Sequence, residues 1–329
     1  AGGAAGRTAR RSLPPVRGPP QPIGRTPIPA PVGGQTGPME TMNPAGVAPD
    51  GESPDRTKPD TVVLIHGLWM TPRSWEHWVD HYQAHGMRVL TPAYPGFEIE
   101  VEALRENPDL IAAVTVPETV DHLAGVIRSL PRPPIIMGHS FGGTLTQLLL
   151  ARGLGCAGVA INSAPTEGVY VLPPVQAKAL FPALKNPANR HKAFGFTPEQ
   201  FHYAFTNTLS EEESRAVWDR YHIPAPGNLI WEYGFIANLK PGHQETWVDY
   251  TADRPPLLFI AGGRDHTMPP AVQRANAKRY QKSGALTDYH EFGDRDHWTC
   301  GAPGWETVAD YALNWAIAHA SSPLLARSR

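Results

Sequence analysis

A serine between glycines follows a short apolar run near the middle of the chain. Residues 138–142 have the sequence GHSFG, directly after the apolar residues 135–137, and helical periodicity begins at Thr144. This G-x-S-x-G pattern between a strand and a helix is typical of a nucleophile elbow, a sharp turn that holds the serine hydroxyl clear of the sheet. N–H groups at the start of the helix can stabilise an oxyanion. We therefore predict that Ser140 is a nucleophile.

His297 is the histidine whose position fits a general base. A serine hydroxyl is a weak nucleophile until a base removes its proton, but with fourteen histidines in the chain the residue type alone selects none. His297 lies in the sequence GDRDHW at 293–298, between the last predicted strand and the last predicted helix. Loops at the carboxyl ends of strands build the sites of open α/β sheets. We predict His297 as the base, and the alternative is a surface histidine held by Asp294 or Asp296.

Asp265 is the candidate for the acid that orients this histidine. It lies in the sequence AGGRDHTMPP at 261–270, after the preceding predicted strand. The glycines allow a tight exit from the strand, which turns the carboxylate toward the loop that carries His297, called the histidine loop below. The base needs such a partner because the partner fixes its tautomer. The alternative is an aspartate that caps the helix near Pro269.

The elements that position these side chains alternate between strands and helices. Short β-branched or apolar runs predict strands at 61–65, 87–90, 135–137, 157–161, 257–261 and 286–292. Helical spacing of apolar residues predicts helices at 72–84, 118–130, 144–152, 271–282 and 304–319. This alternation predicts parallel βαβ units, and therefore an α/β fold with a mostly parallel, doubly wound sheet covered on both faces.

Two long segments depart from the alternating pattern. Residues 166–254 are too long for an ordinary connection and rich in aromatics, and we predict a helical cap or lid insertion there. Its aromatic side chains either form a small core of their own or line an apolar cleft. Residues 1–58 are dense in Pro, Gly and Ala, and we predict a disordered N-terminal extension. The predicted core then comprises residues 59–165 and 255–321, followed by a tail at 322–329.

From the GHSFG motif outward, the chain resembles the α/β-hydrolase superfamily, in its serine esterase- and lipase-like branch with a cap insertion. The resemblance covers about residues 61–320. Similar proteins place the nucleophile after the fifth strand, the acid after the seventh and the histidine after the eighth. With 61–65 counted as the third strand, Ser140, Asp265 and His297 take these places in order, and the cap is inserted after the sixth strand. The first two strands of the family are not visible, so we expect a reduced sheet.

The resemblance also implies an oxyanion hole. Residues 66–69 have the sequence HGLW, and in similar enzymes this His-Gly loop supplies one N–H while the residue after the nucleophile supplies the other. In this chain these are the backbone amides of Leu68 and Phe141. Trp69 and Trp298 lie beside the predicted catalytic loops, and we expect them to line a largely apolar substrate pocket.

Five further histidines are interpreted differently. His66 is interpreted as a loop anchor instead of a proton carrier, and His139 is given no role. His77, His81 and His85 are four residues apart along a predicted helix, a spacing that can bind a metal. The neighbouring glutamate of an H-E-x-x-H site is missing, because a tyrosine follows the second of the three. We therefore interpret them as solvated, and we predict no metal site and no cofactor.

The composition argues against several classes of protein. The 329 residues carry a net charge of -2, which leaves no electrostatic footprint for nucleic acid. No stretch approaches the run of about 18 apolar residues that a membrane span needs. The only two cysteines, Cys156 and Cys300, argue against a disulfide framework and fit a reducing compartment. The first residues show no convincing export signal, so we expect a cytoplasmic protein with a small-molecule substrate and an oligomeric state that the sequence leaves open.

The leading functional hypothesis is a serine hydrolase that cleaves a carboxylic ester with an apolar acyl or aromatic part through an acyl-enzyme. Thioester hydrolysis, carbon–carbon bond hydrolysis and cofactor-free perhydrolysis use the same triad, and the fold does not separate them. A hypothesis from another class is a ligand receptor with vestigial catalysis under the cap. Ser140 argues against the epoxide hydrolases and haloalkane dehalogenases of this fold, because those enzymes use an aspartate as nucleophile.

Overall fold

The computed structural model describes residues 58–231, 242 and 245–320. The predicted N-terminal extension, apart from its last residue, lies outside these ranges, as do the predicted tail and most of residues 232–244 of the predicted insertion. Among the described helices, none combines the length and the hydropathy that crossing a membrane requires.

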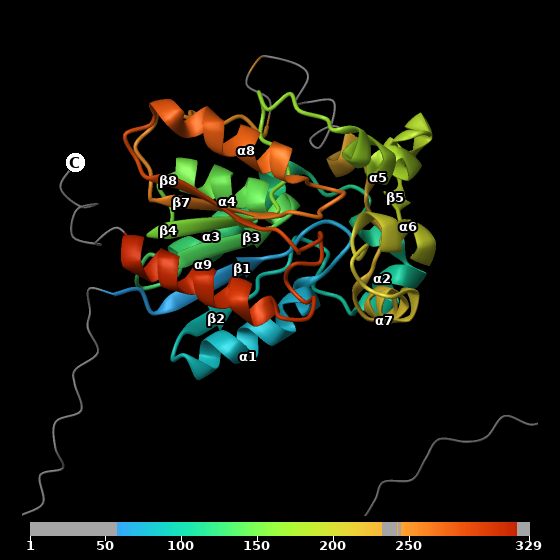
Figure 1. Cartoon of the computed structure of the whole chain (residues 1–329), viewed down its shortest axis with the longest axis horizontal. Coiled ribbons are helices and arrows are strands. Elements are labelled where there is room, and N and C mark those ends of the chain that lie inside the picture. Colours follow the sequence, from blue (N-terminus) through green and yellow to red (C-terminus); the bar gives the residue numbers. More distant parts are fainter. Residues whose placement is uncertain (1–57, 232–241, 243–244, 321–329) are drawn as a thin grey trace, which may run out of the picture. The chain divides into compact units, whose positions relative to one another are not determined.

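A parallel sheet of six strands forms the centre of the described structure (Figure 1). In spatial order the strands are β2 (Arg88–Leu90), β1 (Thr61–Ile65), β3 (Ile135–His139), β4 (Ala157–Ile161), β7 (Leu257–Gly262) and β8 (Thr287–Phe292), and each neighbouring pair is parallel. Every residue of the four inner strands is buried, which explains why these segments are apolar runs without polar alternation. The predicted fold class, an α/β fold with a mostly parallel and doubly wound sheet, is confirmed.

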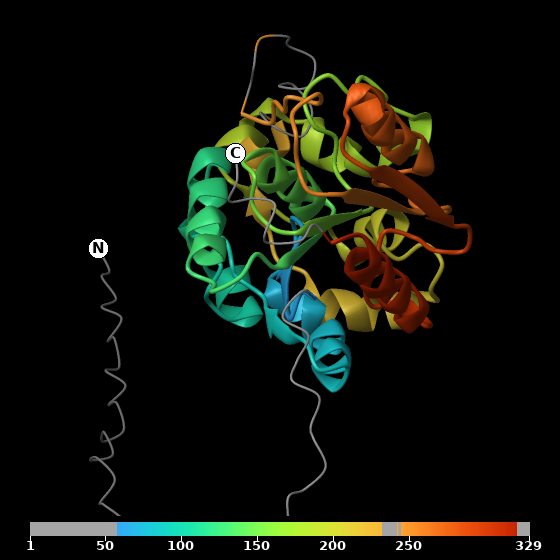
Figure 2. The ribbon, with the colours of Figure 1, turned by 90° about the vertical axis from the view of Figure 1, so that its left-hand side faces the viewer.

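Two layers of helices cover the sheet (Figures 1 and 2). In β1, Val62 and Leu64 face one layer while Val63 and Ile65 face the other, because alternate residues of a strand point to opposite faces. The first layer consists of α1 (Glu76–Ala84) and α9 (Trp305–His319), and the second of α3 (Val116–Arg128), α4 (Phe141–Ala151) and α8 (Pro270–Arg279). Each layer buries its own apolar cluster, so the sheet separates two cores.

The predicted helices and strands agree with these elements to within a few residues. The largest shift at a helix start is in α4, which begins at Phe141 instead of 144 because the glycines of the motif join its first turn. Short helices were missed, because four to six residues leave too little periodicity to detect. They are α2 (Val101–Glu106) and η2 (Pro108–Ile111), between β2 and α3. Two more 3-10 turns lie within predicted helices: η1 (Pro72–Trp75) is the start of the helix predicted at 72–84, and η6 (Tyr280–Lys282) is the end of the one predicted at 271–282.

Residues 166–254, which we call the inserted segment, connect β4 to β7. The elements described in it are α5 (Pro174–Leu184), η3 (Pro187–His191), β5 (Ala193–Phe194), α6 (Pro198–Ala204), α7 (Glu211–Tyr221) and β6 (Ala225–Pro226). Figure 1 shows α5, α6 and α7 together at one end of the sheet. Both α6 and α7 begin with a capping box, in which Thr197 pairs with Gln200 and Ser210 with Glu213. These reciprocal bonds satisfy two N–H groups at each helix start, which lets such short helices form.

Among the described residues, the buried aromatic side chains of the inserted segment do not form a separate core. Phe196, Phe201 and Phe205 belong to the same buried cluster as the side chains of α3 and α4. The inserted segment therefore packs as a continuation of the second core, beyond the edge of the sheet.

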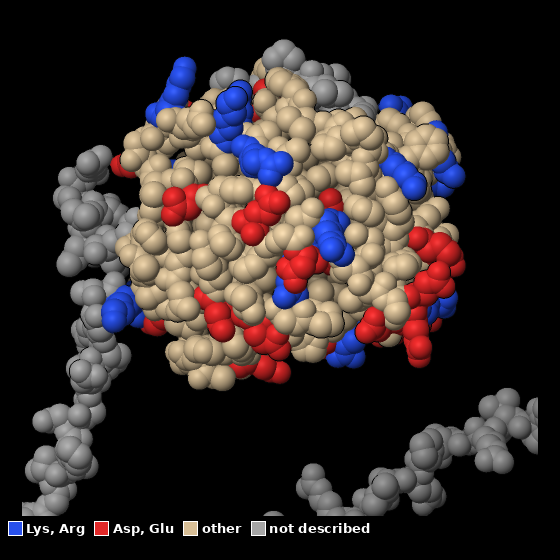
Figure 3. Space-filling view, in the orientation of Figure 1, with Lys and Arg blue, Asp and Glu red and all other residues tan. Residues whose placement is uncertain are grey.

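Charged side chains are mixed on the surface. Figure 3 shows Lys and Arg interspersed with Asp and Glu over the face in view. This mixture agrees with the net charge of -2 for the whole chain.

Candidate active site

Ser140 occupies a strained turn between β3 and α4. Its backbone has φ 56° and ψ -118°, which a residue with a side chain rarely adopts, and its N–H donates to the carbonyl oxygen of Ile161 at 2.9 Å. The flanking glycines are required by close packing. A Cβ atom at Gly138 would lie 2.0 Å from the carbonyl oxygen of Gly142, and one at Gly142 would lie 2.2 Å from that of Ile65. The motif thus has glycine at both positions because no larger residue fits.

The three predicted side chains lie together at this turn. His297 Nε2 is 3.1 Å from Ser140 Oγ, and His297 Nδ1 is 2.7 Å from Asp265 Oδ2. The second oxygen of the carboxylate, Oδ1, accepts from the backbone N–H groups of Thr267 and Met268, both at 2.7 Å. The carboxylate is therefore fixed by three donors, and the imidazole between it and the serine can hold only the tautomer with hydrogen on Nδ1.

The sheet explains how residues so distant in sequence meet. Ser140 directly follows β3, and the acid and histidine loops follow β7 and β8, so all three leave the same edge of a parallel sheet. Two backbone hydrogen bonds join the acid and histidine loops: Gly263 N–H donates to Phe292 and Arg264 N–H donates to Arg295, both at 2.8 Å. The two loops are therefore held as one unit.

His139, to which the sequence analysis assigns no role, contacts the candidate base. Its Nε2 lies 2.8 Å from the carbonyl oxygen of His297, and the two rings are 4.7 Å apart. Burial lowers the pKa of His139 well below its usual range, so the ring is neutral and its Nε2–H donates this bond. The residue before the nucleophile thus positions the backbone of the histidine loop.

Asn162 is a second residue that the sequence analysis missed. Its side-chain amide donates to the carbonyl oxygen of Asp296 at 3.0 Å, and its Oδ1 accepts from the N–H of Gly262 at 2.7 Å. It follows β4 in a left-handed conformation with φ 43°, which asparagine tolerates better than most residues. Asn162 therefore holds together the acid loop, which follows β7, and the histidine loop, which follows β8. The feature of the sequence that could have identified this residue is an asparagine directly after a buried strand.

Asp296 joins the histidine loop to the inserted segment. Its Oδ2 accepts from the N–H and the hydroxyl of Thr208 at 3.1 and 2.6 Å. Burial raises the pKa of its carboxyl group, and the donors of Thr208 and Trp298 oppose that rise. Asp296 holds the loop from its buried side, and His297 itself is 0% exposed, which excludes the surface-histidine alternative.

The predicted oxyanion loop packs directly against the nucleophile. A Cβ atom at Gly67 would lie 2.9 Å from the Cβ of Ser140. Phe141 is the first residue of α4, where a backbone N–H has no acceptor within the helix. His66 is buried, stacks on Tyr94 at 3.9 Å, and has its pKa lowered to about 4 by burial. A neutral, stacked imidazole fits the interpretation of His66 as a loop anchor.

Aromatic side chains of the inserted segment cover the candidate base. The ring of Phe205 meets that of His297 edge-on at 4.7 Å. Trp69 packs on Phe205 and on Phe196, at 5.9 and 4.8 Å, and its Nε1–H donates to the carbonyl oxygen of Phe194 at 3.0 Å. Ser140 is only 2% exposed beneath this cover.

The two tryptophans predicted to line a pocket have different surroundings. Trp69 belongs to the aromatic cover over His297. The ring of Trp298 instead packs on Tyr221 of α7 at 5.0 Å, while its backbone N–H donates to the carbonyl oxygen of Phe205 at 2.9 Å. Trp298 thus connects the histidine loop to the inserted segment.

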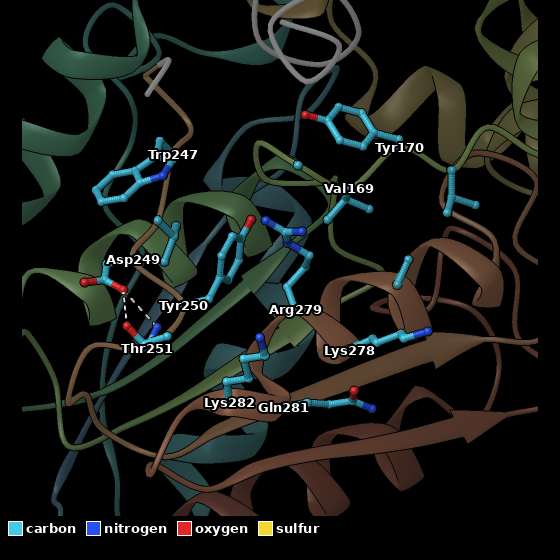
Figure 4. Close-up of a pocket in the computed structure, with 14 residues that line it drawn as sticks. Val169, Tyr170, Trp247, Asp249, Tyr250, Thr251, Lys278, Arg279, Gln281 and Lys282 are labelled. Atoms are coloured by element: carbon cyan, nitrogen blue, oxygen red, sulfur yellow. Dashed lines mark hydrogen bonds between the residues drawn. The ribbon is translucent and has the colours of Figure 1, made fainter. Parts of the chain in front are cut away.

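A cavity of about 630 Å³ lies elsewhere, at the far end of α8 (Figure 4). Its lining includes Lys278 and Arg279 at the end of α8, and Tyr170 and Trp247 of the inserted segment. Asp265 precedes the start of α8, and a helix of ten residues is about 15 Å long. This cavity is therefore distinct from the cluster around Ser140.

Comparison with solved structures shows the same fold in several hydrolases. An extracellular α/β-hydrolase from a Paenibacillus species matches with a TM-score of 0.59 and 19% identity, over 78% of this chain and 98% of that one. A monoacylglycerol lipase from Paleococcus ferrophilus matches with a TM-score of 0.55 and 18% identity, over 80% and 96% of the two chains. Polyneuridine aldehyde esterase matches with a TM-score of 0.55 and 15% identity, over 79% and 100%.

Sequence comparisons give a family and no individual relative. No curated protein matched the chain. The model of the alpha/beta hydrolase family matches residues 62–310, which include every strand of the central sheet except the first residue of β1. The resemblance inferred from the GHSFG motif is confirmed, and the chain belongs to the alpha/beta hydrolase family.

Proposed function

We propose that this protein is a serine-dependent hydrolase of carboxylic esters, with Ser140 as nucleophile, His297 as general base and Asp265 as the orienting acid. The observation that carries the proposal is the bonded chain from Asp265 Oδ2 to His297 Nδ1 at 2.7 Å and from His297 Nε2 to Ser140 Oγ at 3.1 Å. A nucleophile, a base within hydrogen-bond reach and a third group orienting the base are the parts that acyl transfer through a serine requires.

The reaction proceeds through an acyl-enzyme. Ser140 Oγ attacks the carbonyl carbon of the ester while its proton passes to His297 Nε2, and Asp265 stabilises the resulting imidazolium. The N–H groups of Leu68 and Phe141 bind the oxyanion of the tetrahedral intermediate. His297 then protonates the departing alcohol. Finally, water deprotonated by His297 attacks the acyl group, which releases the acid and regenerates Ser140.

The inserted segment is proposed to act as the cap of this site. The contact of Phe205 with His297 supports this role, as does the bond between Thr208 and Asp296. Since Ser140 is 2% exposed, substrate entry requires this cap to move. We further propose that Trp69 and Trp298 shape the pocket, which then favours an ester with an apolar acyl or aromatic part.

Similar structures favour an ester over the other substrates of such a triad. The protein from Paenibacillus, the lipase and polyneuridine aldehyde esterase share only the fold, but two of the three are described as an esterase or a lipase. A receptor function, and thioester or carbon–carbon bond hydrolysis, are outcomes that the experiment separates from ester hydrolysis, and cofactor-free perhydrolysis is a further alternative on the same triad. A cytoplasmic location is also proposed, with support from Cys156 and Cys300, which are both buried and unpaired.

Labelling with a fluorophosphonate probe tests the nucleophile, and a series of p-nitrophenyl esters from acetate to palmitate tests the substrate. We expect rapid labelling of the native protein, burst kinetics on the esters, and loss of both in Ser140→Ala. The matched control is Ser129→Ala, which removes an exposed serine whose hydroxyl bonds to the carbonyl of Val126. This control is expected to label and turn over like the native protein.

Three outcomes would contradict the proposal. Labelling that survives Ser140→Ala would exclude Ser140 as the nucleophile. Stoichiometric ligand binding with negligible turnover would favour a receptor. Strong Ser140-dependent labelling with no activity on any ester would favour thioester or carbon–carbon bond hydrolysis.

A further inference from the structure

A histidine of α1, the histidine that caps the end of this helix and an aspartate of α9 meet on the outer side of the first helix layer. His81 and His85 are one helical turn apart, and Asp310 approaches them from α9. One nitrogen or oxygen atom from each of the three lies within 4.8 Å of the other two. His81 Nε2 and Asp310 Oδ1 are 2.6 Å apart. This juxtaposition is independent of the proposed esterase site.

In place of the interpretation of these histidines as solvated, we propose that His81, His85 and Asp310 form a binding site for a divalent transition-metal ion, with Zn²⁺ as the representative ligand. Imidazole nitrogens and a carboxylate oxygen are ligands that Zn²⁺ takes in proteins, and three protein ligands leave a fourth position for water. Histidines four residues apart present their rings on the same face of a helix, which lets both reach one ion.

The hydrogen bonding of His85 fits a metal ligand. Its Nδ1 lies 2.8 Å from the carbonyl oxygen of His81, so Nδ1–H donates and Nε2 keeps its lone pair. Histidines that bind metals commonly donate their other ring N–H to a backbone carbonyl, because this fixes the tautomer and the direction of the ring.

Hydrogen bonds beneath this cluster tie α1 to the loop before α9 and to α9 itself. Trp78 Nε1–H donates to the carbonyl oxygen of Cys300, and the hydroxyl of Tyr82 donates to that of Ala309, both at 2.8 Å. Ala309 is the neighbour of Asp310, and Tyr82 is the neighbour of His81. The second bond therefore sets the distance between two of the proposed ligands.

Binding requires only a small movement of side chains. Ligand atoms about 2.0–2.2 Å from a tetrahedral Zn²⁺ lie about 3.3 Å from one another, so His81 Nε2 and Asp310 Oδ1 must separate slightly. Asp310 can make this adjustment because its side chain is 49% exposed.

His77 is excluded from the site, although the sequence places it at the same spacing from His81. Its ring stacks on Trp305 at 5.8 Å, and its Nε2 faces the hydroxyl of Tyr221 at 3.5 Å. The sequence contains two pairs of histidines at the same spacing, His77 with His81 and His81 with His85. In the structure it is the second pair that lies together with Asp310.

The test is titration of the untagged full chain with ZnCl₂ at pH 7.5, followed by calorimetry and by competition with a chromophoric chelator. We expect one saturable site per chain, with affinity reduced at least about tenfold in His85→Ala and in Asp310→Asn. His77→Ala is the matched control and is expected to bind like the native protein. Affinity should fall as the pH is lowered, because protons compete with the metal ion for its ligand atoms.

Thermal unfolding gives a second measurement that does not depend on activity. A metal ion bound across α1 and α9 stabilises only the folded chain, so a hundredfold excess of Zn²⁺ over Kd is expected to raise Tm by about 5–10 °C. The increase should be absent in His85→Ala and retained in His77→Ala. Circular dichroism of the variants without metal verifies that each is folded.

Several results would overturn this site. A native protein with no saturable binding, or a His85→Ala variant that binds as tightly as the native protein, contradicts it directly. Equal losses in His77→Ala and His85→Ala would indicate adventitious binding to exposed histidines. A loss in His85→Ala without a loss in Asp310→Asn would reduce the site to the two histidines at the end of α1 and exclude the ligand from α9.

Discussion

His297 is held at three points by groups from two segments, the loop after β7 and the end of β3 with the turn that follows it. Its Nδ1 faces Asp265, its Nε2 faces Ser140, and its carbonyl oxygen accepts a hydrogen bond from His139. The first two contacts direct the ring, and the third fixes the backbone that carries it. A base held in this way loses little freedom when it takes a proton, which is the advantage of a positioned catalytic group.

Asp265→Asn tests whether the acid controls the tautomer of the base. The asparagine oxygen can still accept from Thr267 and Met268, so its NH₂ group would face His297 Nδ1 and place the hydrogen on Nε2. An imidazole with hydrogen on Nε2 cannot accept the proton of Ser140. We expect kcat for ester hydrolysis to fall about 10⁴-fold with little change in folding, measured by steady-state kinetics and circular dichroism.

Asp294→Asn is the matched control for this variant. Asp294 lies in the histidine loop, three residues before His297, and its side chain is 74% exposed. We expect its kcat to stay within about threefold of the native value. A native rate in Asp265→Asn would show that this carboxylate has no part in the reaction.

At the scale of elements, the turn between β3 and α4 depends on the close approach of three backbone segments. Gly142 lies against the carbonyl oxygens of Ile65 and His66, where an added Cβ would be 2.2 and 2.6 Å away. Backbone atoms of a buried strand cannot move aside as a flexible side chain could. The position of Ser140 is therefore set by the packing of α4 on β1.

Gly142→Ala measures the cost of disturbing this packing. The methyl group must push α4 away from β1, and we expect the free energy of unfolding to fall by at least about 3 kcal/mol. Gly284→Ala is the control, because a Cβ there meets nothing within 4 Å. The free energy of unfolding of Gly284→Ala, measured by urea denaturation, should stay within about 0.5 kcal/mol of the native value. Equal stability of the two variants would mean that the turn can relax freely.

The inserted segment touches the candidate base through side chains that no motif marks. Phe205 contacts His297, and Thr208 binds Asp296 of the same loop. Both follow α6, an element that ends at Ala204. Movement of this short stretch would therefore disturb the histidine loop.

At the scale of the whole molecule, buried neutral histidines make folding sensitive to acid. Burial lowers the pKa of His66 to about 4 and that of His222 to about 3, against about 6.5 in an unfolded chain. Below about pH 6.5 these two imidazoles take up protons in the unfolded chain but stay neutral in the folded chain. The stability that these groups provide is therefore present above pH 6.5 and is lost progressively as the pH falls toward their folded pKa values.

His222→Gln should reduce this acid sensitivity. His222 Nε2 accepts from the N–H of Phe196 at 3.0 Å, and a glutamine oxygen can accept the same bond. One such buried histidine makes the free energy of unfolding fall by about 1.4 kcal/mol per pH unit as the pH is lowered. Between pH 6 and 4.5 this fall should therefore be less steep in the variant by about that amount. Urea denaturation at several pH values measures the slope. An unchanged slope would contradict the assignment, and His122→Gln is the control for replacing an exposed histidine.

The sequence alone predicted most of the sheet and the three candidate catalytic residues. Strands such as β1 and β3 are buried on both faces, so their apolar runs are visible without any knowledge of the partners. The glycines around Ser140 are visible for a similar reason, because a local turn admits no other residue. The roles of Ser140, Asp265 and His297 stay proposals, although their distances support them.

Only the tertiary structure decided which distant side chains meet. Nothing in the local pattern at His139, Asn162 or Phe205 predicts a contact with the histidine loop, because each contact depends on how separate loops pack above the sheet. In the same way, Asp310 approaches His81 only after α1 and α9 pack side by side. Local patterns reflect each segment's own burial and turns, whereas contacts between segments depend on the relative placement of the elements, which a single sequence does not reveal.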